Sequence, residues 1–287
     1  MKVILLTTLA LLAFAGNSIL CRLALGENAI DAASFTSIRL FSGVIVLLLL
    51  LKALQPRSTN VSTGSWKAAF MLFIYAIAFS FAYVSLDTGT GALILFASVQ
   101  ITMILIGLIT GNRLYLFEWL GVIIAFSGFV YLVIPGVSAP SLTGFILMAA
   151  AGVAWGFYTL AGRGSKNPLS DTTYNFMRTL PLVVVLVAVT ILNATFSWQG
   201  IVLAILSGGI TSGIGYAIWY MALGGLSATQ AAVLQLLVPV IAALGGVVFA
   251  DEVLSTRLLL SSTMILGGIL MVILGKYYYD QRLLGKK

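Results

Sequence analysis

The sequence contains no histidine and only one cysteine, Cys21. Metal sites of the His/Cys kind and imidazole proton relays both need residues that this chain lacks, so both are excluded. One cysteine also permits no internal disulfide. We therefore expect neither a metal nor a cofactor.

Charge is also scarce: 8% of the 287 residues are charged, whereas 61% are hydrophobic and the mean hydropathy is +1.12. A water-facing surface needs far more charge than this, so we expect the lipid bilayer to be the protein's surroundings. Unbroken apolar runs such as 45–51 and 183–189 favour helices over the alternating strands of a membrane barrel. The basic net charge of +7 is no sign of nucleic-acid binding here, because it follows from where the basic residues lie.

Ten stretches have the length of about 20 apolar residues that a spanning helix needs. The connections between them are short and leave no room for a catalytic or nucleotide-binding domain, which excludes ATP-driven transport within this chain. The predicted fold is an all-α integral membrane protein of ten transmembrane helices. The ten stretches are 3–24, 31–52, 66–86, 90–110, 115–134, 142–162, 173–192, 199–221, 228–249 and 257–276.

Features of the first half recur in the second half at a nearly constant offset. Gly16 recurs as Gly156 at an offset of 140, and Arg39 recurs as Arg178 at an offset of 139. Ordered matches of this kind indicate a duplicated five-helix module. We expect two domains, residues 1–137 and residues 138–287.

Basic residues are distributed unevenly between the two sides of the predicted membrane. With the N-terminus inside, eleven Lys and Arg fall on the cytoplasmic side and only Arg22 and Arg257 fall outside. The positive-inside rule then predicts that both termini are cytoplasmic. Five spans per half make the second domain inverted relative to the first, which is typical of secondary transporters.

Polar and aromatic residues at mid-membrane depth are the best indication of a transport pathway, because burying them is costly. Tyr216 and Trp219 share a helical stripe with Ser212, and the repeat offset places Tyr75 and Phe79 on the equivalent stripe of the third span. Trp219 also lies close enough to a span end to belong to an interfacial belt. The candidate substrate-binding residues are Asn17, Tyr75, Phe79, Ser98, Trp155, Tyr158, Tyr216, Trp219 and Gln235.

Three further residues are candidates for bending during transport. Gly209 and Gly213 provide either close helix packing or a flexible point, and packing is the interpretation favoured by small residues at four-residue spacing. Pro239 lies inside the ninth span, where it removes a backbone hydrogen bond.

Arg39 and Arg178 are the charges found well within spans. Structural pairing with backbone carbonyls or loop acids is favoured for both over contact with a substrate. No Asp or Glu lies at mid-membrane depth, so we expect a neutral or zwitterionic small-molecule substrate that moves down its own gradient, or coupling by a route that the sequence does not reveal.

The leading helices of the two inverted halves carry Gly16 and Trp155-Gly156, and the next helices carry Arg39 and Arg178. In the second half, Pro239 is followed by Glu252 and Gly268. In these features and in its ten spans, the chain resembles the EamA-type drug/metabolite transporter superfamily. The run Trp155 to Tyr158 and the region of Tyr75 look most like YddG-type exporters of aromatic and other amino acids. This resemblance implies a central cavity, export of amino acids and location in a bacterial inner membrane, and it carries Tyr75, Trp155 and Tyr158 over as site residues.

Other functions stay open at this point. A nucleotide-sugar or organic-phosphate carrier would need several cationic residues in its cavity, and multidrug efflux of aromatic cations is a further alternative. An intramembrane enzyme would need a nucleophile with a base, and no such pair is found. No obligate protein partner is evident.

Overall fold

The structure is a computed structural model that describes residues 2–54, 63–111, 114–136, 139–162, 165–223, 225–226 and 228–284. In this part of the chain, ten helical segments are long and apolar enough to cross a membrane. The helices are α1 (Lys2–Leu25), α2 (Ala32–Leu54), α3 (Trp66–Tyr83), α4 (Thr88–Ile109), α5 (Leu116–Val133), α6 (Leu142–Ala161), α7 (Pro168–Thr190), η1 (Ile191–Asn193), α8 (Trp198–Leu206), η2 (Ser207–Ile214), α9 (Gly215–Leu223), α10 (Ala228–Gln235), α11 (Leu237–Phe249) and α12 (Thr256–Leu284). The predicted all-α membrane fold is confirmed.

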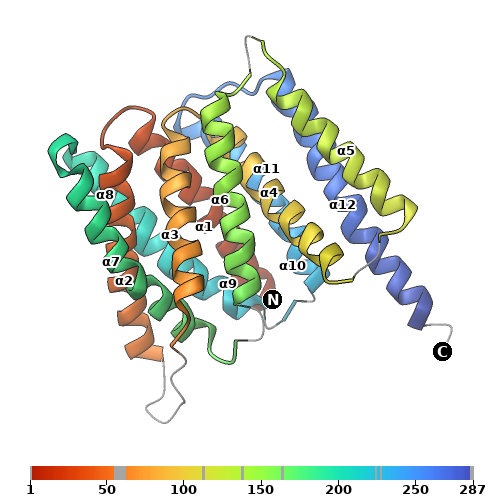
Figure 1. The fold of residues 1–287 in the computed structure, drawn as a ribbon, viewed down its shortest axis with the longest axis horizontal. Helices are drawn as coiled ribbons and strands as arrows, with labels where there is room; N and C mark the ends of the chain where they lie inside the picture. The colour runs from red at the N-terminus through yellow and green to blue at the C-terminus, as the bar shows by residue number, and fades with distance from the viewer. Residues whose placement is uncertain are drawn as a thin grey trace.

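The helices form one bundle with its connections at two ends (Figure 1). We call the end where α1, α3, α5, α7 and α11 finish the upper end, and the opposite end, near which both termini lie, the lower end. The helices α1, α3, α6 and α9 gather at the centre, while α5 and α12 form a pair along one side.

Helix contacts in the first half of the chain recur in the second half. Helix α6 packs on α3 and α4, and α1 packs in the same way on the α8–η2–α9 span and on α11. The pairs α2–α7, α4–α11 and α5–α12 each join helices that occupy equivalent places in the two halves. This pattern of contacts is the one that an inverted five-helix repeat predicts.

Helices α5 and α12 approach so closely that glycine is required on both. A Cβ atom added to Gly121 would meet the carbonyl oxygen of Gly268, and one added to Gly268 would meet Gly121 in return. Gly128 faces Ile265 and Met264 just as tightly. In lipid, where no hydrophobic drive joins helices, such backbone contact supplies the packing energy.

Two of the described spans depart from regular α-helix in their interior, and the seventh ends in the 3-10 helix η1. The eighth contains the π-helix η2, in which each backbone bond spans one residue more than in an α-helix. The ninth is broken at Leu236, between α10 and α11. Pro239 lies in the first turn of α11, and it has no backbone N–H to donate to the carbonyl oxygen of Gln235, so the helical bonding is interrupted next to the break. The sequence predicted a single uninterrupted span over 228–249, and the break is the difference.

Candidate functional site

A small cavity lies at the centre of the bundle, between α1, α3, α4, α6 and the π-helical span. Its volume is about 20 Å³, which is room for about one water molecule. Ligand pockets usually measure about 300–1,000 Å³, so the site is contracted in this structure. The residues that line it are Phe14, Asn17, Ser18, Tyr75, Phe79, Leu95, Phe96, Trp155, Thr211 and Tyr216.

Aromatic rings form one wall of the cavity, and Trp155 is at their centre. Its ring centroid lies 4.7 Å from that of Tyr75, 5.0 Å from that of Tyr216 and 5.2 Å from that of Tyr158. Phe14 meets Tyr216 edge to face at 5.9 Å. Rings at these separations attract one another beyond their burial, and a flat or cationic group inserted among them would gain the same contacts.

Local sequence explains why these rings point inward. Tyr75 and Phe79 follow each other at i and i+4 on α3, so one face of that helix presents both. On α6, Gly152 and Gly156 lie against Leu95, Ser98 and Thr102 of α4 with no space for a side chain. This close approach of α4 and α6 brings Trp155 to the cavity.

Polar groups from α1 and η2 form the opposite wall. The side-chain oxygen of Asn17 accepts hydrogen bonds from Ser207 Oγ at 2.7 Å and from Thr211 Oγ1 at 3.2 Å. Ser18 is 1% exposed and also lines the cavity, and its hydroxyl can donate or accept a hydrogen bond.

Arg39 lies on α2 beside this site and is 2% exposed. Its Nη2 donates to the hydroxyl of Tyr75 at 3.1 Å, and its Cζ lies 5.3 Å and 4.8 Å from the ring centroids of Tyr75 and Phe79. Its Nη1 is buried and has no hydrogen-bond partner. The sequence predicted structural pairing with a carbonyl or an acid, and for Arg39 the partners found are rings and one hydroxyl.

Five of the nine candidate substrate-binding residues line the cavity: Asn17, Tyr75, Phe79, Trp155 and Tyr216. The other four lie outside its wall. Ser98 packs against Gly152, Tyr158 stacks behind Trp155, Trp219 is 8% exposed against Phe14, and Gln235 lies at the break between α10 and α11. Whether any of the nine contacts a substrate stays a prediction.

The sequence reasoning missed Phe14, Ser18, Leu95, Phe96 and Thr211 as lining residues. Helical spacing did not indicate Thr211, because this residue lies in the π-helix η2. The i, i+4 and i+7 spacing used for Ser212 and Tyr216 holds only in an α-helix. Phe14 lies three residues before Asn17, and Ser18 lies four residues after Phe14, so helical spacing along this inward side of α1 would have indicated both.

The candidate hinge glycines lie within η2. Gly209 and Gly213 face Val46 of α2 at distances that leave little room for a Cβ atom, which fits the packing interpretation. Gly208 is pressed still more tightly against the backbone of Arg39. Pro239 is buried next to the break in the ninth span. The structure thus places the three candidates at the two irregular points of the bundle.

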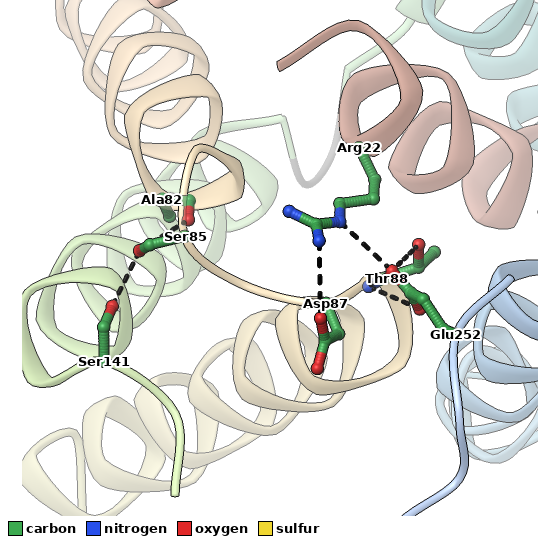
Figure 2. Close-up of polar contacts among 7 residues, drawn as sticks. All are labelled: Arg22, Ala82, Ser85, Asp87, Thr88, Ser141 and Glu252. Atoms are coloured by element: carbon green, nitrogen blue, oxygen red, sulfur yellow. Dashed lines mark hydrogen bonds and ion pairs between the residues drawn. The ribbon is translucent and has the colours of Figure 1, made fainter. Parts of the chain in front are cut away.

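A group of polar residues at the upper end, the upper cluster, consists of Arg22, Asp87, Thr88 and Glu252 (Figure 2). Arg22 Nε lies 3.2 Å from Glu252 Oε1, and Arg22 Nη2 lies 3.5 Å from Asp87 Oδ1. Glu252 also accepts from the backbone N–H and the hydroxyl of Thr88 at 2.8 Å and 2.9 Å. The cluster therefore joins α1, the start of α4 and the segment before α12.

A polar cavity of about 340 Å³ lies beside the upper cluster. Asp87, Thr90 and Glu252 line it together with the serine pair Ser85 and Ser141, whose hydroxyl oxygens are 2.7 Å apart. This pair ties the α3–α4 turn to the start of α6. The upper end thus carries a polar recess directly next to its ion pairs.

A second group of polar residues, the lower cluster, consists of Gly64, Ser65, Asp171, Asn175 and Arg178. Asp171 accepts from the backbone N–H of Gly64 at 2.8 Å, and Asn175 accepts from that of Ser65 at 2.9 Å. Arg178 donates to the carbonyl oxygen of Thr63. For Arg178 the predicted pairing with a backbone carbonyl is therefore found. The cluster fixes the start of α3 to the first turns of α7.

Comparisons with known proteins agree with this arrangement. Residues 142–274 match the model of the EamA-like transporter family. An uncharacterized protein of Pseudomonas aeruginosa is 48% identical over 272 residues, which cover 95% of this chain and 94% of that protein. The threonine/homoserine exporter RhtA of Escherichia coli K12 is 25% identical over 260 residues, covering 86% of this chain and 82% of the exporter.

One solved crystal structure matches the fold with a TM-score of 0.60 at 20% identity, covering 93% of this chain and 98% of its own. At that identity the likeness concerns the fold alone. The YddG-like branch stays a prediction. Taken with ten spanning helices and a central cavity, the matches establish a transporter rather than an enzyme. The chain belongs to the EamA-like transporter family.

Proposed function

We propose that this transporter exports small zwitterionic metabolites, above all amino acids including aromatic ones, through the central cavity by alternating access. The observation that carries the proposal is the composition of that cavity. One wall is a cluster of rings centred on Trp155, and the other holds the amide of Asn17 and the hydroxyl of Ser18. Such a site suits a molecule with an apolar or aromatic body and a polar head.

The contracted cavity supports a mechanism in which the site changes volume. A space of about 20 Å³ holds no amino acid, so the helices around it must separate when substrate enters. Movement is easiest where regular hydrogen bonding is already interrupted, at η2 with Gly209 and Gly213 and at the break beside Pro239. We assign the hinge role to these two points.

The direction of transport rests on the charge distribution. The lower end carries most of the basic residues, and the positive-inside rule makes it the cytoplasmic end of a protein in a bacterial inner membrane. Substrate then enters from the lower end and leaves past the upper cluster. The repeated helix contacts support the division into domains 1–137 and 138–287.

Counterflow in proteoliposomes tests the proposal. Vesicles loaded with an unlabelled amino acid should accumulate the labelled form of that amino acid, and Trp155→Ala should lower the initial rate about ten-fold. Trp198→Ala is the matched control, because Trp198 is 79% exposed at the start of α8 and remote from the cavity wall. A rate in Trp155→Ala equal to that of the control would contradict the site assignment.

The same assay separates the alternative substrates. Flux inhibited by phosphate esters but not by amino acids would indicate an organic-phosphate or nucleotide-sugar carrier. Flux of aromatic cations alone would indicate multidrug efflux. Accumulation driven by an imposed pH gradient, without a substrate gradient, would overturn the expectation of uncoupled transport.

A further inference from the structure

Arg39 carries a buried positive charge for which the described part of the chain provides no carboxylate. Both ion pairs found among the described residues involve Arg22, at the upper end. Arg39 is 2% exposed, makes one hydrogen bond, to Tyr75, and leaves its buried Nη1 without a partner. A guanidinium group stays charged in any protein environment, so the charge cannot be removed by loss of a proton.

The surroundings of Arg39 compensate its charge only in part. The rings of Tyr75 and Phe79 face the guanidinium and contribute cation–π attraction. That attraction is weaker than an ion pair with a carboxylate, and it leaves Nη1 unsatisfied. A site that retains such a charge gains stability when an anion binds.

The position of Arg39 connects this unpaired charge to the transport site. Tyr75 and Phe79, the two rings that contact the guanidinium, also line the central cavity. Ser18, another lining residue, is buried, and its hydroxyl can donate or accept a hydrogen bond. A buried guanidinium N–H without a partner, next to rings that line the cavity, indicates a ligand that supplies acceptor oxygens.

We propose that Arg39 binds the carboxylate of the transported molecule, and that the transporter consequently discriminates amino acids from their amides and from the corresponding amines. This inference rests on the proposed function and names the chemical group that the site selects. Tyr75 moves aside as the cavity widens, and two N–H groups of the guanidinium donate in parallel to the carboxylate. The ammonium group of the amino acid then faces the rings of Trp155 and Tyr216.

The number of charges favours a carboxylate over a phosphate ester. One arginine balances the single negative charge of a carboxylate, whereas a phosphate monoester carries nearly two at neutral pH. The other arginine within a span, Arg178, is engaged with the carbonyl of Thr63 and the ring of Trp66, away from the cavity. It is therefore a matched control: the same residue type at the equivalent repeat position, with a hydrogen bond to a backbone carbonyl.

The test is a competition experiment on the full-length protein in proteoliposomes. Counterflow of labelled L-phenylalanine and L-threonine is measured while unlabelled amino acid, its amide or its decarboxylated amine competes. In the wild type, the amino acid should compete about thirty-fold better than the amide. In Arg39→Gln this ratio should fall by about ten-fold or more, and in Arg178→Gln it should stay at the wild-type value.

The ratio distinguishes binding from a purely structural role, because a damaged fold would weaken the competition by acid and amide alike. If Arg39→Gln is not recovered as folded protein, Arg39→Lys carries the test. It keeps the charge but loses the two-point geometry, so the ratio should fall about three-fold or more. An unchanged ratio in a folded Arg39 variant overturns the inference. Absence of counterflow for both amino acids in the wild type would instead refute the proposed function, and the inference with it.

Discussion

The upper and lower clusters both join distant parts of the chain, but the upper cluster does so partly with ion pairs between side chains. In the upper cluster, Arg22 is held by the carboxylates of Asp87 and Glu252, and Glu252 also accepts from the backbone N–H of Thr88 at the start of α4. In the lower cluster, Asp171 and Asn175 bond to backbone N–H groups at the start of α3. Ion pairs between side chains can separate without unwinding a helix, whereas the lower contacts are part of how α3 begins.

This difference indicates which end is built to open. The upper cluster links α1 and α4, two helices that line the central cavity, and a polar recess of about 340 Å³ already lies next to it. The lower cluster links α3 to α7, and it fixes helix starts rather than closing a cavity. We expect the upper cluster to act as a releasable seal and the lower cluster to keep the scaffold together.

The largest effect should follow from removing Glu252. Glu252→Ala leaves Arg22 with Asp87 alone and removes both bonds to Thr88, which should lower the free energy of unfolding by about 2–3 kcal/mol. The upper end should also open more often. In a Cys21→Ser background, a cysteine placed at Thr90 should react with an impermeant maleimide about ten-fold faster.

Glu27→Ala is the control for this experiment, because Glu27 is an exposed acid at the same end and belongs to neither ion pair. It should change neither the labelling rate nor the stability. Equal labelling rates in Glu252→Ala and Glu27→Ala would contradict the idea of a seal.

A smaller loss should result from Gly64→Ala, which acts on the lower cluster. Gly64 has φ +62°, and a Cβ atom there would collide with the side chain of Asn175. Left-handed backbone alone costs a non-glycine residue about 1–2 kcal/mol. Gly111→Ala separates the two causes, since Gly111 has φ +98° and nothing within 4 Å. Thermal unfolding should show a larger loss for Gly64→Ala, without faster labelling at position 90.

The sequence predicted the wall of rings well because helical periodicity determines it. Tyr75 and Phe79 lie one turn apart on α3, and Trp155 falls on the equivalent inner face of α6. Periodicity failed at Thr211, where the π-helix changes the spacing. For Trp219 the sequence allowed either an interfacial belt or the cavity, and the structure buries this side chain against Phe14.

Contacts between distant residues were beyond such reasoning. Arg22 and Glu252 are 230 positions apart, and nothing in either local sequence pairs them. The repeat offset equates Arg39 with Arg178, but Arg39 is buried under two rings of α3, whereas Arg178 donates to the carbonyl oxygen of Thr63 just before α3. Equivalent positions in a duplicated sequence therefore share a place in the fold without sharing an environment.

A third prediction concerns the acid of the lower cluster. Asp171→Asn keeps an oxygen that can accept from Gly64, but it loses the charge that strengthens this bond and that favours the first turn of α7. The expected loss of stability is about 1 kcal/mol. Labelling at position 90 should not change. Faster labelling would mean that the two ends are coupled, and the contrast between the clusters would then be wrong.

The smallest effect is a pH dependence at Asp31, which makes the same kind of bond as Asp171 but at the upper end. Asp31 accepts from the backbone N–H groups of Ala33, Ser34 and Thr195. Burial raises the pKa of its carboxyl, but these hydrogen bonds outweigh burial and hold the pKa below its ordinary value.

A lowered pKa in the folded state means that the charged form contributes stability, which is complete above the ordinary pKa of about 4 and is lost as the pH falls through the lower value. The difference in unfolding temperature between the wild type and Asp31→Asn should therefore stay constant from about pH 7 to pH 5 and shrink below about pH 4. A difference that grows on acidification would mean that backbone hydrogen bonds do not hold the pKa of this carboxyl below its ordinary value.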